Sequence, residues 1–302
     1  MIWVEYILQT ENLTKSYSGK SVINKVNLEV PKGAVYGLIG KNGSGKTTTM
    51  RMITGLATPT SGNIRFFEDS YRGKHRSKIS AVIEYPSFYP SMNAKQNMQA
   101  QSLALGIKNN KSIGELLELV GLTGTAGKKV KNFSLGMKQR LAISMALIGE
   151  PDFLFLDEPI NGLDPSGIKE IRHLIINLNQ EKNVTIMISS HILGELEKIA
   201  THYGVLKEGE LIEQFSSEEI KSRIKSCIKV RVNDASRALE VIVQNLNIQD
   251  YKLEEKEIII YDESADSRTI NSELVKNDIV VESIAAENGD YEDYFIKLMG
   301  GN

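Results

Sequence analysis

Short apolar runs, each closed by turn residues, alternate with helix-like stretches along much of the chain. Strands are predicted at Val22–Val30, Ala34–Ile39, Gly62–Phe67, Phe153–Leu156 and Val184–Ser189. Helices are predicted at Lys46–Leu56 and Ser166–Gln180, each between two of these strands. This order, with strands that are apolar on both faces, predicts an α/β fold with a parallel sheet. A hairpin over 203–215 is expected to close this domain.

The middle of the chain, about 88–150, has helical periodicity instead. An apolar stripe with spacings of three and four residues is formed by Ile113, Leu116, Leu117, Leu119 and Val120. Ser134 is a good N-cap for a helix at Leu135–Ile148, which Gly149 and Pro151 end. These residues predict a helical lobe inserted into the α/β domain.

The pattern starts again after about Ser216. Strands are predicted where Ile228, Val230 and Val232 alternate with polar residues, and at Glu257–Tyr261 and Ile279–Ala285. Helices are predicted at Ala235–Leu246 and Ser267–Lys276. The expected organisation is an α/β domain over 1–215 and a small C-terminal α+β domain of ferredoxin type over 216–302.

Charge is divided unevenly between these two parts. Residues 216–302 carry 11 Lys and Arg against 18 Asp and Glu, whereas the formal net charge of the whole chain is −2. This near balance of charges argues against nucleic acid as a partner.

No run approaches the roughly 18 apolar residues of a membrane-spanning helix, so any membrane function is expected to come from another subunit. The single cysteine, Cys227, cannot form an internal disulfide, which is consistent with a reducing cytoplasm.

The sequence G-x-x-x-x-G-K-[ST] lies between the predicted strand that ends at Ile39 and the helix that begins at Lys46. Its residues are Gly40, Lys41, Asn42, Gly43, Ser44, Gly45, Lys46 and Thr47, and Thr48 follows. Glycines let the backbone wrap closely around a phosphate, and the helix N-terminus attracts its charge. Lys46 is expected to neutralise phosphate oxygens and Thr47 to hold Mg²⁺. The loop therefore predicts a binding site for ATP and Mg²⁺.

Two carboxylates, Asp157 and Glu158, directly follow the apolar run Phe153–Leu156. They are expected at the carboxyl end of a buried strand, where α/β sheets bind their ligands. Asp157 is expected to help hold Mg²⁺ through water, and Glu158 to act as the base that polarises the attacking water. Charged residues routinely end strands, and it is the phosphate loop that makes these two carboxylates candidates for catalysis.

A further motif, Phe133-Ser134-Leu135-Gly136-Met137-Lys138-Gln139-Arg140, stands at the start of the helix that Ser134 caps. With the loop and the two carboxylates, it makes residues 1 to about 215 resemble the ATP-binding cassette (ABC) ATPases. The resemblance implies the fold of a P-loop NTPase with an inserted helical lobe. It also implies that Ser134 and Gly136 contact the γ-phosphate of an ATP held by the opposite subunit. Leu135 and Met137 depart from the family's LSGGQ-type signature, where glycine and glutamine are usual.

Three shorter matches extend the resemblance. Asn161-Gly162-Leu163-Asp164 matches the family's D-loop. His191, after the strand that begins at Val184, matches the switch histidine, which implies a contact with the γ-phosphate. Tyr17 matches the aromatic residue that stacks on adenine.

Glu84 stands where the family usually has a glutamine that senses Mg²⁺ and the permease. A carboxylate can still reach Mg²⁺ through its oxygens, and the alternative is a surface glutamate. Glu84, the segment Pro86-Ser87-Phe88-Tyr89-Pro90 and the variant signature resemble the exporter subfamily linked to bacitracin resistance and lantibiotic self-immunity.

The resemblance implies an ATP hydrolase that powers a separate integral membrane permease, with a peptide antibiotic or another amphipathic compound as the exported substrate. Gly40–Thr47 and Ser134 of one chain cannot face each other across one nucleotide, so a dimer of ATPase subunits, a homodimer or a heterodimer, is implied. Tyr85–Met92 and the helical lobe are expected to contact the permease at the cytoplasmic face of the membrane. Residues 216–302 could bind a regulator, support the dimer or cover a sheet edge.

The alternative is a soluble ABC ATPase that acts on ribosomes or nucleic acid and is not part of a transporter. Such proteins commonly carry two cassettes or long coiled coils. This chain has one phosphate loop, no sustained heptads and an acidic C-terminal part, and these features favour the transporter subunit.

Overall fold

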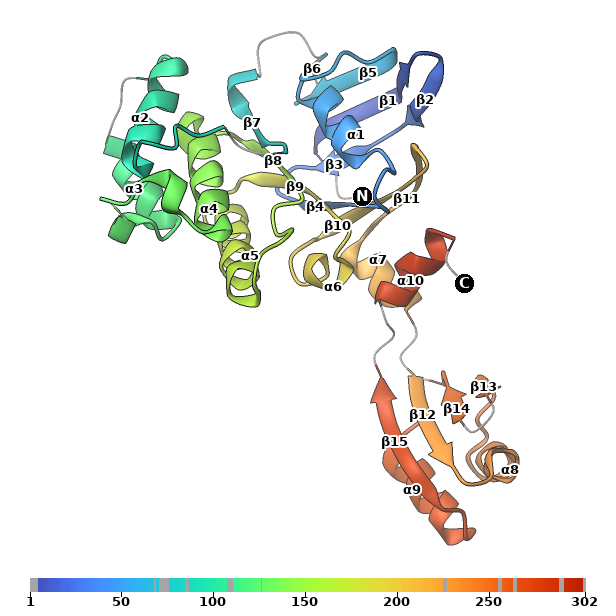
Figure 1. Cartoon of the computed structure of the whole chain (residues 1–302). Helices are drawn as coiled ribbons and strands as arrows, with labels where there is room; N and C mark the ends of the chain where they lie inside the picture. Colours follow the sequence, from blue (N-terminus) through green and yellow to red (C-terminus); the bar gives the residue numbers. More distant parts are fainter. Residues whose placement is uncertain are drawn as a thin grey trace. The chain divides into compact units, whose positions relative to one another are not determined.

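The computed structural model describes residues 5–67, 69–70, 76–84, 87–107, 111–125, 127–224, 227–254, 257–262, 265–287 and 291–300. Within these ranges, no helix is long and apolar enough to cross a membrane. The chain forms two compact units, residues 1–217 together with 295–302, and residues 218–294. Figure 1 shows their helices and strands.

A six-stranded sheet lies at the centre of the first unit, in the order β11-β10-β4-β9-β8-β7. Its strands are β4 (Val35–Ile39), β7 (Ile79–Val82), β8 (Phe153–Asp157), β9 (Thr185–Ser190), β10 (His202–Lys207) and β11 (Glu210–Ser216). The strands from β10 to β7 are parallel, and β11 is antiparallel to β10 as the second strand of the predicted hairpin. Strands β4, β8 and β9 are buried along their whole lengths, as their continuous apolar runs predict.

A second, antiparallel sheet packs against helix α1 (Lys46–Ile53) and shares one apolar core with the central sheet. Its strands are β1 (Tyr6–Tyr17), β2 (Lys20–Val26), β3 (Glu29–Pro31), β5 (Ser61–Phe66) and β6 (Asp69–Ser70). The prediction of a single strand at Val22–Val30 is wrong, because the chain forms the two strands β2 and β3 there, with Asn27 and Leu28 between them. Core contacts between the sheets include the rings of Phe66 and Phe153, whose centroids are 6.3 Å apart.

The predicted helical lobe is formed by α2 (Ala94–Ala104), α3 (Lys111–Leu119) and α4 (Leu135–Ala146), which Figure 1 shows gathered beside β7 and β8. Asn93 caps α2 in a capping box with Gln96. Ser134 caps α4 as predicted, since its hydroxyl accepts a hydrogen bond from the Met137 N–H at 3.3 Å.

Helix α5 (Pro165–Gln180) joins β8 to β9, and the shorter helices α6 (Leu193–Leu196) and α7 (Ser217–Arg223) follow. The side chain of Asp164 caps α5, and Pro165 occupies its first position. Asn161-Gly162-Leu163-Asp164 therefore forms the turn that leads from the end of β8 into α5.

Nearly all of α7 belongs to the second unit, where it precedes elements in the order βαββαβ with a four-stranded antiparallel sheet in the order β13-β14-β12-β15. These elements are β12 (Cys227–Val232), α8 (Ala235–Leu246), β13 (Tyr251–Glu254), β14 (Glu257–Ile260), α9 (Ser267–Lys276) and β15 (Val281–Glu287). This order confirms the predicted ferredoxin-like arrangement. The inward-facing Ile228, Val230 and Val232 are buried in its core, in agreement with their alternation in the sequence.

The C-terminal residues differ from the expected boundaries. Helix α10 (Tyr291–Leu298) runs back to the first unit, which includes residues 295–302. The Phe295 side chain is 1% exposed, and its ring centroid lies 5.5 Å from that of Tyr203 and 5.9 Å from that of Phe215. The second unit is therefore an insertion into the first, over 218–294, and the 216–302 segment is not one body.

Candidate active site

The predicted phosphate loop connects the end of β4 to the start of α1. Gly43 and Gly45 have φ values of 80° and 105°, in the left-handed region that favours glycine. A Cβ atom on Gly40 would lie 2.4 Å from the carbonyl oxygen of Leu206, and one on Gly45 would lie 2.3 Å from Cδ1 of Ile23. The glycines of the loop are therefore required by its close packing as well as by its turns.

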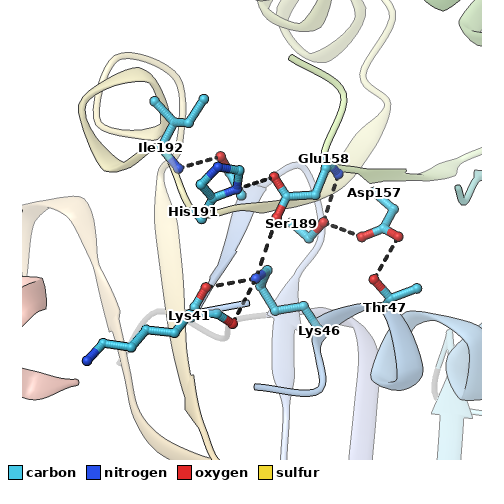
Figure 2. Close-up of polar contacts among 10 residues, drawn as sticks. Lys41, Lys46, Thr47, Asp157, Glu158, Ser189, His191 and Ile192 are labelled. Atoms are coloured by element: carbon cyan, nitrogen blue, oxygen red, sulfur yellow. Dashed lines mark hydrogen bonds and ion pairs between the residues drawn. The ribbon is translucent and has the colours of Figure 1, made fainter. Parts of the chain in front are cut away.

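Lys46 directs its ammonium group back into the concave side of this loop. Its side chain is 6% exposed, and Nζ donates to the carbonyl oxygens of Gly40 at 2.7 Å and Lys41 at 3.3 Å. Nζ also lies 3.5 Å from Oε1 of Glu158, as Figure 2 shows. The buried Ser44 hydroxyl has no hydrogen-bond partner among the described residues. A buried cation beside an unpartnered hydroxyl and backbone N–H groups fits a phosphate chain.

Asp157 is held from two sides at the end of β8. Thr47 Oγ1 donates to its Oδ2 at 2.9 Å, and Ser189 Oγ donates to its Oδ1 at 2.5 Å. The Glu158 N–H donates in turn to Ser189 Oγ at 2.9 Å. Hydroxyl and carboxylate oxygens, completed by phosphate oxygens, are the donor set that suits Mg²⁺. No cluster of three or more His, Cys, Asp and Glu that could hold a metal ion occurs in the part of the chain that the structure describes.

Glu158 lies between an ammonium group and an imidazole ring. Its Oε1 faces Lys46, and its Oε2 lies 2.8 Å from Nδ1 of His191, which directly follows β9 (Figure 2). Glu158 has a left-handed backbone with φ of 48°, which is uncommon for a residue with a side chain. The fold therefore positions both oxygens of this carboxylate at the mouth of the loop. A carboxylate so placed can accept a proton from a water molecule next to the phosphates.

Glu84, the third predicted metal ligand, contacts a different group. Its Oε1 forms an ion pair with Nη2 of Arg51, in the last turn of α1. Glu84 nevertheless lines the same groove of about 950 Å³ as Asp157 and Glu158. Tyr85 and Pro86, which follow it, lie outside the described residues.

The remaining candidates stand apart from this cluster. Within the described residues, no hydrogen bond or ion pair joins Ser134, Gly136 or Tyr17 to the phosphate loop. Leu135, beside Ser134, is half-exposed and lines the groove together with Gly162. Tyr17 ends β1 with its ring half-exposed and the Lys15 ammonium 4.8 Å from its centroid. Lys41, Asn42 and Gly43 form the exposed lip of the loop, and Thr48 is half-buried on α1.

Two residues of the site were not among the sequence candidates. Ser189 orients Asp157 and Glu158. Its position at a strand end, directly before Ser190 and His191, could have indicated in the sequence that Ser189 belongs to the site. Arg51 forms an ion pair with Glu84. Arg51 follows Thr47 by four residues on one helix, and this spacing could have indicated that both residues lie on the helix face of the site.

Comparisons with known proteins agree with this geometry. The family model described as ABC transporter matches residues 23–161. The bacitracin transport ATP-binding protein BcrA of Enterococcus faecalis is 41% identical, over 100% of this chain and 99% of the relative. The lantibiotic transport ATP-binding protein SrtF of Streptococcus pyogenes is 46% identical, over 68% of this chain and 89% of the relative. A solved dimeric ATP-binding cassette, in a post-hydrolysis state with ADP and Pi, is 25% identical, with a TM-score of 0.62 over 70% of this chain and 98% of that one.

A phosphate loop by itself is common to many nucleotide-binding folds. The match to BcrA, in contrast, covers both units of this chain, and the match to the solved cassette covers nearly all of that structure. Members of this family bind ATP, dimerise and work with membrane permeases. The chain belongs to the ABC transporter family as an ATP-binding subunit that hydrolyses ATP.

Proposed function

We propose that this subunit powers a separate membrane permease, at the cytoplasmic face of the membrane, and that the complex exports a peptide antibiotic or a similar amphipathic compound. The observation that carries this proposal is the 41% identity to a bacitracin transport protein over 100% of this chain. The lantibiotic transport relative supports the same class of substrate. Glu84, Leu135 and Met137 are the variant residues that favour this subfamily within the ABC transporters.

In the proposed site, Lys46 and the N–H groups of the loop bind the phosphates of ATP, while the half-exposed Tyr17 ring stacks on the adenine. Thr47 and Asp157 hold Mg²⁺, which offsets negative charge on the phosphates when bound. Glu158 accepts the proton of the attacking water through one oxygen, while His191 orients the carboxylate through the other. Ser189 fixes the Asp157 carboxylate and the Glu158 backbone with the same hydroxyl.

Ser134 and Gly136 are proposed to complete the site of a second subunit, because no hydrogen bond or ion pair of the described residues joins them to the loop of their own chain. Two inactive variants should therefore restore activity when mixed. Lys46→Ala removes the phosphate-binding ammonium. Gly136→Asp places a carboxylate against the phosphate of the partner's ATP. The nearest atom to the new Cβ is Leu163 Cδ2 at 3.8 Å, so the substitution causes no steric clash within its own chain.

An equimolar mixture of these variants is expected to reach up to about a quarter of the wild-type ATP turnover, because half of the randomly paired dimers hold one intact site of two. Each variant alone is the control. A mixture that gives only the average of the two separate rates would mean that no site is shared between subunits.

The exposed Tyr89 is proposed to contact the permease. Its ring is 58% exposed, while its backbone is fixed by the buried Asn97, which accepts from the Tyr89 N–H at 2.8 Å and donates to the Tyr89 carbonyl oxygen at 3.2 Å. Tyr89→Ala is expected to weaken permease binding by about fivefold to thirtyfold, the usual loss for an aromatic interface anchor. Binding to the purified permease in detergent measures this loss. Tyr251→Ala, at an exposed tyrosine of the second unit, is the matched control, and equal effects of both would refute the assignment.

The transport function itself is tested in the native host. Deleting the gene should increase susceptibility to bacitracin or a lantibiotic, and the wild-type gene, but not Glu158→Gln, should restore resistance. The tagged chain should co-purify with an integral membrane protein from solubilised membranes. Unchanged susceptibility to both compound classes together with co-purification of ribosomes would instead support the non-transport alternative.

A further inference from the structure

Helix α1 contacts two carboxylates at one edge of the central sheet. Thr47 Oγ1 donates to Asp157, and Arg51 forms an ion pair with Glu84. Thr47 and Arg51 are four residues apart, so they lie one above the other on the same face of α1. One helix face therefore holds the end of β8 through Thr47 and the segment after β7 through Arg51.

The two carboxylates are close to the same groove because β7 and β8 are parallel partners. Val82 of β7 pairs with Leu156 of β8, so both strands end at the same edge of the sheet. Glu84, Asp157 and Glu158 all line the groove at this edge. Carboxylates gathered in one place repel each other unless cations compensate them. Lys46 is the cation at Glu158, and Arg51 is the cation at Glu84.

Two properties of Glu84 suit a group that changes partners. Its backbone has φ of 60°, so the fold places this carboxylate at the groove in spite of an unfavourable conformation. The side chains of Arg51 and Glu84 are 38% and 56% exposed, and ion pairs between exposed groups are weak. A divalent cation, which prefers carboxylate oxygens, can therefore compete with the guanidinium for Glu84.

We propose that Arg51 is the counter-ion of Glu84 and competes for this carboxylate with the Mg²⁺ that binds together with ATP. This inference rests on the proposed Mg²⁺ site at Thr47 and Asp157. The competing role for Arg51 is independent of Glu84, because a cation in the last turn of α1 also interacts favourably with the helix dipole.

A double-mutant cycle separates these roles. Binding of a fluorescent, non-hydrolysable ATP analogue to the full-length chain is measured against the concentration of free Mg²⁺. Arg51→Gln frees Glu84 and should lower the Mg²⁺ midpoint by about twofold to fivefold, the strength of an exposed ion pair. Glu84→Gln removes a carboxylate from the metal and should raise the midpoint by about tenfold. In the Glu84→Gln background, Arg51→Gln should change the midpoint by less than about twofold, because the pair is already lost.

Two further variants control for charge and for folding. Arg51→Lys keeps the positive charge and should shift the midpoint less than Arg51→Gln does. Arg65→Gln breaks a similarly exposed Arg–Glu pair, Arg65 with Glu11 at 2.9 Å, away from the groove, and should leave the midpoint unchanged. Equal shifts for Arg51→Gln in both backgrounds, or no shift in either, overturn the role of Arg51 while the Mg²⁺ site stands. A wild-type chain whose analogue binding does not depend on Mg²⁺ refutes the site itself.

Discussion

Glu158→Gln is expected to lower ATP turnover by about 10²-fold to 10⁴-fold, the usual contribution of a positioned general base. The amide has nearly the shape of the carboxylate, so the hydrogen bond to His191 can persist, but an amide cannot accept the proton of the attacking water. ATP binding should stay close to that of the wild type, because Lys46, Thr47 and Asp157 are unchanged. With hydrolysis blocked, ATP should hold two subunits together, and size-exclusion chromatography with and without MgATP measures this dimer.

Glu150→Gln is the matched control for this variant. Glu150 also has a left-handed backbone with φ of 48°, but it lies beyond the end of α4 and lines a different pocket from Glu158. Any effect of the substitution on the strained backbone itself should appear in both variants, whereas the loss of turnover should appear only at Glu158. A Glu158→Gln protein that hydrolyses ATP at the wild-type rate would show that another group is the base.

Phe295→Ala is expected to destabilise the first unit by about 3–5 kcal/mol, the cost of removing a fully buried aromatic ring. The Phe295, Tyr203 and Phe215 rings form a cluster with all three centroid distances between 5.5 and 5.9 Å. Truncating one ring removes apolar contacts and leaves a cavity between strands β10 and β11 and the C-terminal helix. Phe295→Leu, which keeps most of the apolar volume, should cost less.

Urea unfolding followed through a bound fluorescent nucleotide analogue reports on the first unit specifically, which matters because two units need not unfold in one transition. A lower midpoint with an unchanged slope is the expected signature. Val275→Ala, at an exposed valine of the second unit, should stay within about 0.5 kcal/mol of the wild type. A loss of less than about 1 kcal/mol for Phe295→Ala would contradict an integral role for residues 295–302 in the first unit.

Local sequence patterns were sufficient for much of the fold and for the centre of the site. The glycines before Lys46 predict the turn into α1, and the apolar run before Asp157 predicts a buried strand. Lys46 and Asp157 could therefore be placed at the same edge of the sheet from the sequence. Strand β1 was missed because polar residues interrupt its apolar pattern and its pairing contains bulges near Leu13 and Lys15.

The features that the sequence did not predict depend on contacts between distant segments. Arg51 and Glu84 are 33 residues apart, and either one alone is an ordinary surface charge. Phe295 lies in a helix with other apolar residues, Ile296 and Leu298, and nothing in this pattern shows that Phe295 packs on Tyr203 and Phe215. Periodicity reports which face of an element is apolar, but it does not identify the segment that covers this face.

The insertion of residues 218–294 sets the order in which the protein can be completed during synthesis. A ribosome produces the chain from the N-terminus, and domains generally fold as they emerge. Tyr203 and Phe215 emerge before the second unit, whereas Phe295 emerges after all of it. Phe295 can therefore join the Tyr203 and Phe215 rings only at the end of synthesis. The aromatic cluster of the first unit is therefore expected to be completed only after the second unit has been translated.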